Sequence, residues 1–252
     1  MDTTAATIFL SFAGLLIGSF LTVVAHRVPR DEPIVAGRSQ CPACGAQIAA
    51  YDNIPVFSWI ALSGRARCCG ERISPRYPLT ELATGALYAA VAYAFHDDAG
   101  ELILGLAFVT TLVAVTVTDL ERRVIPNKIL AVGAAVGLAV AAIADPSSLP
   151  ERAIAAVAAG GILFAAALAY PQGMGLGDVK LAATMGLFLG RAVGPAMLVA
   201  LVAGSLVGLA MIVRHGAAAR KRAIPFGPFL AFGGVVALFA GDELIDWYLD
   251  AF

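Results

Sequence analysis

The sequence has few charged residues and few histidines, and each scarcity argues against a class of protein. Only 14% of its 252 residues are charged and 60% are hydrophobic, so most of the chain is unsuited to water. Its three histidines, His26, His96 and His215, are far apart, and the sequence lacks the His-Glu-x-x-His motif of zinc proteases. It also lacks a Gly-rich nucleotide-binding loop. A water-soluble enzyme and the commonest metalloprotease and nucleotide sites are therefore disfavoured.

Long apolar segments are what the sequence has in place of charge. They are separated by polar or Gly/Pro-containing breaks and cover residues 7–25, 79–95, 101–118, 128–144, 152–170, 178–190, 192–213 and 225–249. We predict an all-α polytopic membrane protein with about eight transmembrane helices. The segment 178–190 is shorter than the roughly 17 residues that usually span a bilayer, so it should be tilted or continuous with its flanking turns. The first segment lacks a basic start and a small-residue cleavage site, which predicts a retained helix.

The basic residues are concentrated on one side of this predicted topology. Of the 17 lysines and arginines, all except Arg152 and Arg191 fall on the side that holds the long loop between the first two helices. By the positive-inside rule that side is the cytoplasm, and both termini lie outside. We therefore predict a first transmembrane helix over residues 1–25, a cytoplasmic loop module over 26–78 and a seven-helix membrane core over 79–252.

All four cysteines of the chain lie in the predicted loop module. Cytoplasmic thiols are normally reduced, so metal binding is a better prediction than a disulfide framework. Cys41 and Cys44 have the spacing of a zinc knuckle, whereas the second half of the candidate site has adjacent cysteines, Cys68 and Cys69. The fourth ligand of a structural zinc ion would be Cys68 or a nearby acid such as Asp52 or Glu71, or the site would have no fourth ligand. Four reduced cysteines packed in a small loop are the alternative.

Two aspartates, Asp119 and Asp178, lie where apolar segments meet the predicted cytoplasmic side. Taken singly, Asp119 would be an interfacial residue at a helix end and Asp178 would be a helix N-cap. Taken together, two carboxylates at one membrane face can share a proton and activate water, as in aspartyl proteases. Gly175 and Gly177 allow a sharp turn and leave space for an extended substrate. Lys180 would either bias the charge of the pair or extend to the membrane interface.

Five blocks of the sequence resemble, in order, those of the type IV prepilin peptidases. They are residues 18–29 (GSFL and HRVP), 52–59 (DNIPVFSW), 73–85 (ISPRYPLTELATG), 118–127 (TDL and IPN) and 175–180 (GLGDVK). The resemblance implies that Asp119 and Asp178 are the catalytic aspartates of a membrane endopeptidase, which removes the basic leader of prepilins and pseudopilins after a glycine. It also implies, as in many members, N-methylation of the new amino terminus with S-adenosylmethionine. Two positions depart from the family: Ala66 replaces a cysteine of the usual zinc site, and Thr22 replaces an asparagine.

Two functions from other classes stay open. An ion transporter or channel would use the two aspartates to line an ion path, and a non-catalytic scaffold of a pilus or secretion machine would not need them. A peptidase without methyl transfer is a narrower alternative. The expected partners are prepilin substrates and membrane lipids, with no nucleic acid, and the expected cofactors are zinc in the loop and S-adenosylmethionine, with none for proteolysis. The expected location is the bacterial cytoplasmic membrane.

Overall fold

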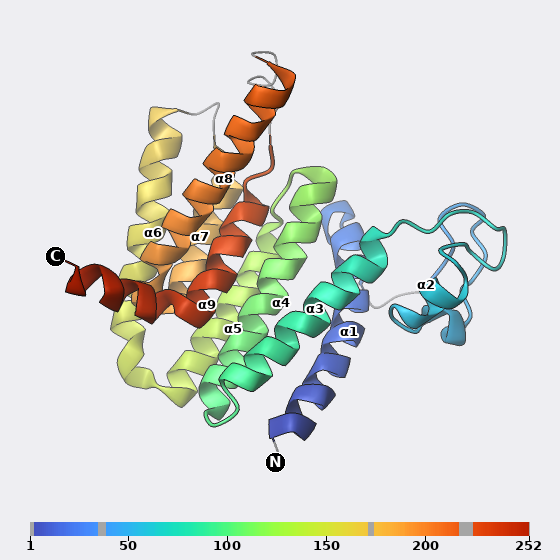
Figure 1. Ribbon diagram of the computed structural model, residues 1–252, viewed down its shortest axis with the longest axis horizontal. Coiled ribbons are helices and arrows are strands. Elements are labelled where there is room, and N and C mark those ends of the chain that lie inside the picture. Colours follow the sequence, from blue (N-terminus) through green and yellow to red (C-terminus); the bar gives the residue numbers. More distant parts are fainter. Residues whose placement is uncertain (1–2, 35–38, 171–173, 217–223, 252) are drawn as a thin grey trace. The chain divides into compact units, whose positions relative to one another are not determined.

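The computed structural model describes residues 3–34, 39–170, 174–216 and 224–251, and these residues are mainly helical (Figure 1). The long helices are α1 (Thr3–Arg27), α3 (Arg76–Ala94), α4 (Ala99–Arg122), α5 (Asn127–Ala144), α6 (Leu149–Ala169), α7 (Leu176–Leu189), α8 (Val193–His215) and α9 (Gly227–Asp250). The short helix α2 (Phe57–Ala61) lies in the loop between α1 and α3. Each predicted apolar segment overlaps one long helix, and the predicted all-α polytopic class is confirmed. Of the basic residues, Arg38, Arg220, Lys221 and Arg222 lie outside the described residues.

Six helical stretches of the described residues are long and apolar enough to cross a membrane. One of them, Leu176–His215, contains both α7 and α8, which are joined by the 3-10 helix Gly190–Ala192. The 14 residues of α7 extend only about 21 Å, and the helix continues into this turn, as its short apolar segment predicts. Helix α3 is not among the six stretches in the described part of the chain. The number of eight crossings therefore stays a prediction.

The helices form two compact units, Met1–Asp97 and Asp98–Phe252. In the first unit, glycines of α1 allow α3 to pack very closely. A Cβ added to Gly18 would lie 2.8 Å from the Cα of Glu81, and one added to Gly14 would lie 2.8 Å from the Cβ of Tyr88. The two helices are antiparallel, because later residues of α3 face earlier residues of α1. By packing, α3 belongs with α1, whereas the predicted division placed it with the membrane core.

Glu81 joins the loop module to the second turn of α3. Its side chain is buried, and it accepts the backbone N–H of Val56 at 2.7 Å. Val56 has a φ of 63°, in a region that β-branched residues rarely adopt. The hydrogen bond to Glu81 offsets part of this strain and holds the segment before α2 against α3.

Helix α7 lies at the centre of the second unit and packs against α4, α5, α6, α8 and α9. Leu181 and Met185 of α7 are fully buried, and Phe188 stacks on Phe108 of α4 with 4.9 Å between the ring centroids. Gly186 allows close approach of α6, since an added Cβ would lie 2.5 Å from the backbone nitrogen of Ala156. Close packing on several sides sets the position of both ends of α7.

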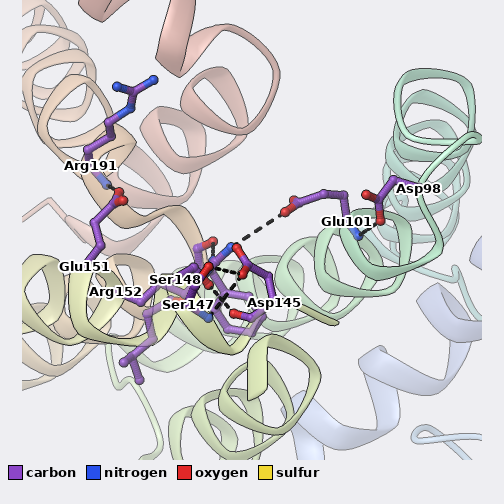
Figure 2. A network of polar contacts seen from close by, with 10 residues as sticks. Asp98, Glu101, Asp145, Ser147, Ser148, Glu151, Arg152 and Arg191 are labelled. Atoms are coloured by element: carbon purple, nitrogen blue, oxygen red, sulfur yellow. Dashed lines mark hydrogen bonds and ion pairs between the residues drawn. The ribbon is translucent and has the colours of Figure 1, made fainter. Parts of the chain in front are cut away.

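A network of polar contacts holds the carboxyl end of α7 (Figure 2). Arg152 of α6 donates to the carbonyl oxygen of Phe188 at 2.5 Å and pairs with Glu101 of α4 at 3.7 Å. Glu151 accepts the backbone N–H of Arg191, just after α7, at 2.9 Å. The last carbonyls of a helix lack partners within it, and Arg152 supplies a donor here. Arg152 and Arg191, the two arginines outside the predicted cytoplasmic side, thus both have structural partners.

We expect Arg152→Met to lower the free energy of unfolding by about 2 kcal/mol or more, because it leaves carbonyl oxygens of α7 without a donor. Arg152 is only 12% exposed and also donates to the Leu187 carbonyl at 3.3 Å. Arg191→Met is the matched control. The Arg191 side chain is 59% exposed and pairs with an exposed Asp242, so the expected loss is below about 1 kcal/mol. Equal losses for the two variants, measured by unfolding in detergent, would contradict the capping role of Arg152.

Candidate active site and metal centre

Asp119 lies in the last turn of α4 and is buried, with 5% of its surface exposed. Its Oδ2 accepts the backbone N–H of Gly227, the first residue of α9, at 2.9 Å. A Cβ at position 227 would lie 2.7 Å from the same oxygen, so the close approach requires glycine. The amino terminus of α9 thus fixes the orientation of the Asp119 carboxylate. Gly227 was not among the predicted site residues, although Gly227-Pro228 has the pattern of a helix start.

Asp178 is the third residue of α7 rather than its N-cap, because the helix begins at Leu176 and the capping position belongs to Gly175. The interpretation of Asp178 as an N-cap is therefore corrected. The two residues are hydrogen-bonded in both directions. Asp178 Oδ2 accepts the Gly175 N–H at 3.2 Å, and the Asp178 N–H donates to the Gly175 carbonyl at 3.1 Å. This reciprocal contact stabilises the turn before α7 and holds the carboxylate at the helix start.

The fold brings Asp119 and Asp178 together, although they are far apart in sequence. The charge of Asp119 acts on the carboxylate of Asp178. The segment after α4 supports this arrangement, since a Cβ added to Gly177 would lie 3.0 Å from the Cβ of Ile125. Neighbouring carboxylates disfavour each other's ionised form, which is the property that acid–base catalysis by an aspartate pair requires.

Lys180 lies one turn from the start of α7 and contacts α5 instead of an acidic residue. Its Nζ donates to the Oδ1 of Asn127, the first residue of α5, at 2.9 Å. The side chain is exposed. The contact links α7 to α5 near Asp178, and Asn127 was not predicted as the partner of Lys180.

The four cysteines form one cluster, with all four sulfur atoms within 4.8 Å of one another. The sulfur atoms are 3.7 Å apart between Cys41 and Cys69 and 3.3 Å apart between Cys44 and Cys68. Tetrahedral zinc, with Zn–S bonds near 2.3 Å, needs sulfur atoms about 3.8 Å apart. The cluster therefore has the composition and size of a four-thiolate metal site. Asp52 instead pairs with Arg67 at 2.9 Å, which favours Cys68 as the fourth candidate ligand.

Two similar turns carry the cysteines. In the first, the Cys41 N–H donates to the Ala46 carbonyl at 2.9 Å and the Gly45 N–H to the Cys41 carbonyl at 2.8 Å. In the second, Ala66 makes the same pair of contacts, with Glu71 at 2.8 Å and Gly70 at 2.7 Å. Ala66 thus occupies the position that Cys41 has in the first turn. Cys68, two residues later, supplies the thiol that is missing there.

The electrostatics of the cluster favour a bound cation. Hydrogen bonds from the backbone N–H groups of Cys44 and Ala43 lower the pKa of the Cys41 thiol to about 7. The neighbouring thiol of Cys44 raises the pKa of Cys68 to about 12. Four thiols at these distances cannot all ionise unless a positive charge lies between them.

Comparisons with known proteins show the family of the chain. Residues 12–95 match the Bacterial Peptidase A24 N-terminal domain, and residues 106–213 match the Type IV leader peptidase family. A prepilin leader peptidase/N-methyltransferase of Aeromonas hydrophila is 36% identical over 94% of this chain and 92% of its own length. A protein of the same name from Bacillus subtilis is 34% identical over 94% of this chain and 95% of its own length. Another, from Burkholderia pseudomallei, is 37% identical over 90% of this chain and 83% of its own length. No solved structure matches the chain. With this similarity along nearly its whole length, the chain belongs to the type IV leader peptidase family.

Proposed function

We propose that this protein removes the basic leader of type IV prepilins and pseudopilins at the cytoplasmic face of the bacterial inner membrane, with Asp119 and Asp178 as its catalytic pair. The observation that carries the proposal is the electrostatic interaction between these two carboxylates, one in the last turn of α4 and the other in the first turn of α7. Family membership supports the reaction, and the charge distribution along the chain supports the membrane side.

The proposed chemistry uses the aspartates as one unit. One carboxylate takes a proton from water, the water attacks the scissile carbonyl, and the protonated partner donates a hydrogen bond to the developing oxyanion. In the described residues, the hydrogen bonds of both carboxylates use Oδ2, which leaves Oδ1 of each for water and substrate. The backbone donors Gly175 and Gly227 keep the two carboxylates oriented before substrate binds, which lowers the cost of reaching the transition state.

The cysteine cluster is proposed as a structural zinc site with Cys41, Cys44, Cys68 and Cys69 as ligands. Its four sulfur donors match the preference of zinc, and a four-thiolate site is closed to substrate. A metal there would hold the two turns of the loop module together, since this segment has few other buried side chains.

Methyl transfer is proposed as a second activity, supported by the relatives that are named prepilin leader peptidase/N-methyltransferase. S-adenosylmethionine, when bound, would supply the methyl group for the new amino terminus. No residue of this chain is assigned to it. Both termini are proposed to lie outside the cytoplasm, in agreement with the acidic residues of the carboxyl end.

The proposal is tested with the purified protein in lipid and a prepilin that has a basic leader. We expect one cleavage after the glycine that precedes the mature sequence, with a further methyl mass on the product when S-adenosylmethionine is added. A prepilin with a bulky residue in place of that glycine is the control, and it should stay uncut. Failure to cut several prepilins would favour an ion transporter or a scaffold instead. Cleavage without the methyl mass would limit the function to proteolysis.

A further inference from the structure

The loop module contains a cavity that neither proteolysis nor metal binding uses. It has a volume of about 410 Å³ and is lined by Trp59, Ser63, Arg65, Arg72, Ser74 and Pro75, among others. This volume lies within the range of small-ligand sites. Its lining residues include one tryptophan, two arginines and two serines.

The two arginines of the cavity lie directly opposite each other. Arg65 and Arg72 form an antiparallel bridge at the base of the second cysteine turn. Like charges directly opposite each other on paired strands are destabilising. In the first turn the equivalent bridge joins two neutral residues, Gln40 and Gln47, so the turn itself does not require charge. An anion bound near both Arg65 and Arg72 would be attracted by the two positive charges and would offset the repulsion between them.

Neither arginine has a carboxylate partner within the described part of the chain. Arg65 donates to the Gly70 carbonyl at 3.3 Å, which leaves its charge uncompensated. By contrast, Arg67, between them in sequence, pairs with Asp52 through two nitrogens at 2.9 Å. The charge of Arg67 is therefore satisfied within the module, while the charges that line the cavity are not.

The aromatic wall of the cavity is held rigidly. The indole Nε1 of Trp59 donates to the Ile73 carbonyl at 3.1 Å. Its ring lies against Gly64, where an added Cβ would be 3.0 Å from the Trp59 Cζ2. The site is thus formed before any ligand binds, which reduces the ordering cost of binding. Paired guanidinium forks and nearby hydroxyls suit the several oxygens of a phosphate group.

The position of the cavity next to α3 favours a lipid as the source of the phosphate. Pro75 immediately precedes α3, which runs antiparallel to the candidate membrane span α1. The start of α3 therefore lies level with the end of α1, where headgroups are found. Tyr77 and Leu79 in the first turn of α3 are 43% and 61% exposed, as expected for side chains in contact with lipid. We propose that the cavity lined by Arg65 and Arg72 binds the phosphate of an anionic phospholipid headgroup.

The proposal is independent of the peptidase activity and can be tested by the fluorescence of Trp59. The chain has two tryptophans, so Trp247→Phe leaves Trp59 as the sole indole. The protein in a nonionic detergent is titrated with short-chain phosphatidylglycerol, phosphatidylcholine or inorganic phosphate, and bound lipid is counted in parallel by native mass spectrometry. We expect saturable binding of phosphatidylglycerol that weakens with salt, and at least tenfold weaker binding of phosphatidylcholine.

Arg65→Gln/Arg72→Gln reproduces the neutral pair of the first turn and should weaken phosphatidylglycerol binding at least tenfold. Arg30→Gln/Arg67→Gln removes the same charge from the same loop outside the cavity and should leave binding within about twofold. Metal content and circular dichroism show whether the turns stay folded. Binding that is unchanged in the first variant, or no bound phosphatidylglycerol in the parent, would overturn the proposal. If inorganic phosphate binds as tightly as phosphatidylglycerol, the proposal that the ligand is a lipid is overturned, and free phosphate is the ligand of the cavity.

Discussion

Asp119→Asn and Asp178→Asn are each expected to lower prepilin cleavage at least about 1,000-fold, because an amide can neither take a proton from water nor share one with its neighbour. Both variants should fold. The asparagine oxygen can still accept the N–H of Gly227 or of Gly175, which are the contacts that position these side chains. Loss of activity would therefore report the chemistry rather than the packing.

The double variant Asp119→Asn/Asp178→Asn separates a catalytic pair from two independent residues. Groups that act as one unit show strongly non-additive losses, so the double variant should be about as inactive as either single variant. Glu121→Gln is the matched control, because Glu121 is an exposed acid in the same turn of α4 as Asp119. Cleavage that persists in both single variants, measured by product mass, would remove the aspartates from the mechanism.

Cys68→Ser is expected to remove most of the bound metal, although Cys68 does not occupy the position of the family's usual cysteine. Its sulfur atom lies 3.3 Å from that of Cys44 and completes the four-thiol cluster. Three thiolates hold zinc far more weakly than four, and the metal stabilises a segment with little core of its own. Elemental analysis should find about one zinc per wild-type chain and much less in the variant. We also expect faster proteolysis of the loop module.

A variant that moves the cysteine from position 68 to position 66 tests whether the two cysteine turns are equivalent. Ala66 has the backbone contacts that Cys41 has in the first turn, so Ala66→Cys/Cys68→Ala should restore metal binding. Cys68→Ala alone, which lacks the new cysteine at position 66, should have as little bound metal as Cys68→Ser. Full metal content in Cys68→Ser would show that another group is the fourth ligand, and a wild-type protein without metal would eliminate the zinc site.

The long helices were predicted from the sequence more completely than the start of α7. Apolar segments predicted the long helices, because the hydrophobicity of about 20 neighbouring residues decides whether a segment spans a membrane. The limits of α7 were less well predicted. Asp178 as an N-cap would start the helix at Val179, whereas α7 begins three residues earlier, at Leu176. The packing of Gly177 against Ile125 and the contact of Asp178 with Gly175 accompany the earlier start.

The metal site shows the same division. Cysteine spacing predicted a site in the loop and left Cys68, Asp52 and Glu71 as candidates for the fourth ligand. The pairing of Asp52 with Arg67 and the geometry of the second turn favour Cys68. Such a choice depends on side-chain directions, which the spacing of residues along the chain does not specify.

The sequence by itself determined the membrane class of this protein, its long helices, its family and the identity of the two aspartates as candidates, because these depend on local composition and on short motifs. Only the tertiary structure decided that Gly227 orients Asp119, that Arg152 caps α7, and that Arg65 pairs with Arg72 at the wall of a cavity. The physical reason is that most of these contacts join residues far apart in the chain. Their formation depends on how whole helices and turns pack, and neighbouring residues do not encode that packing individually.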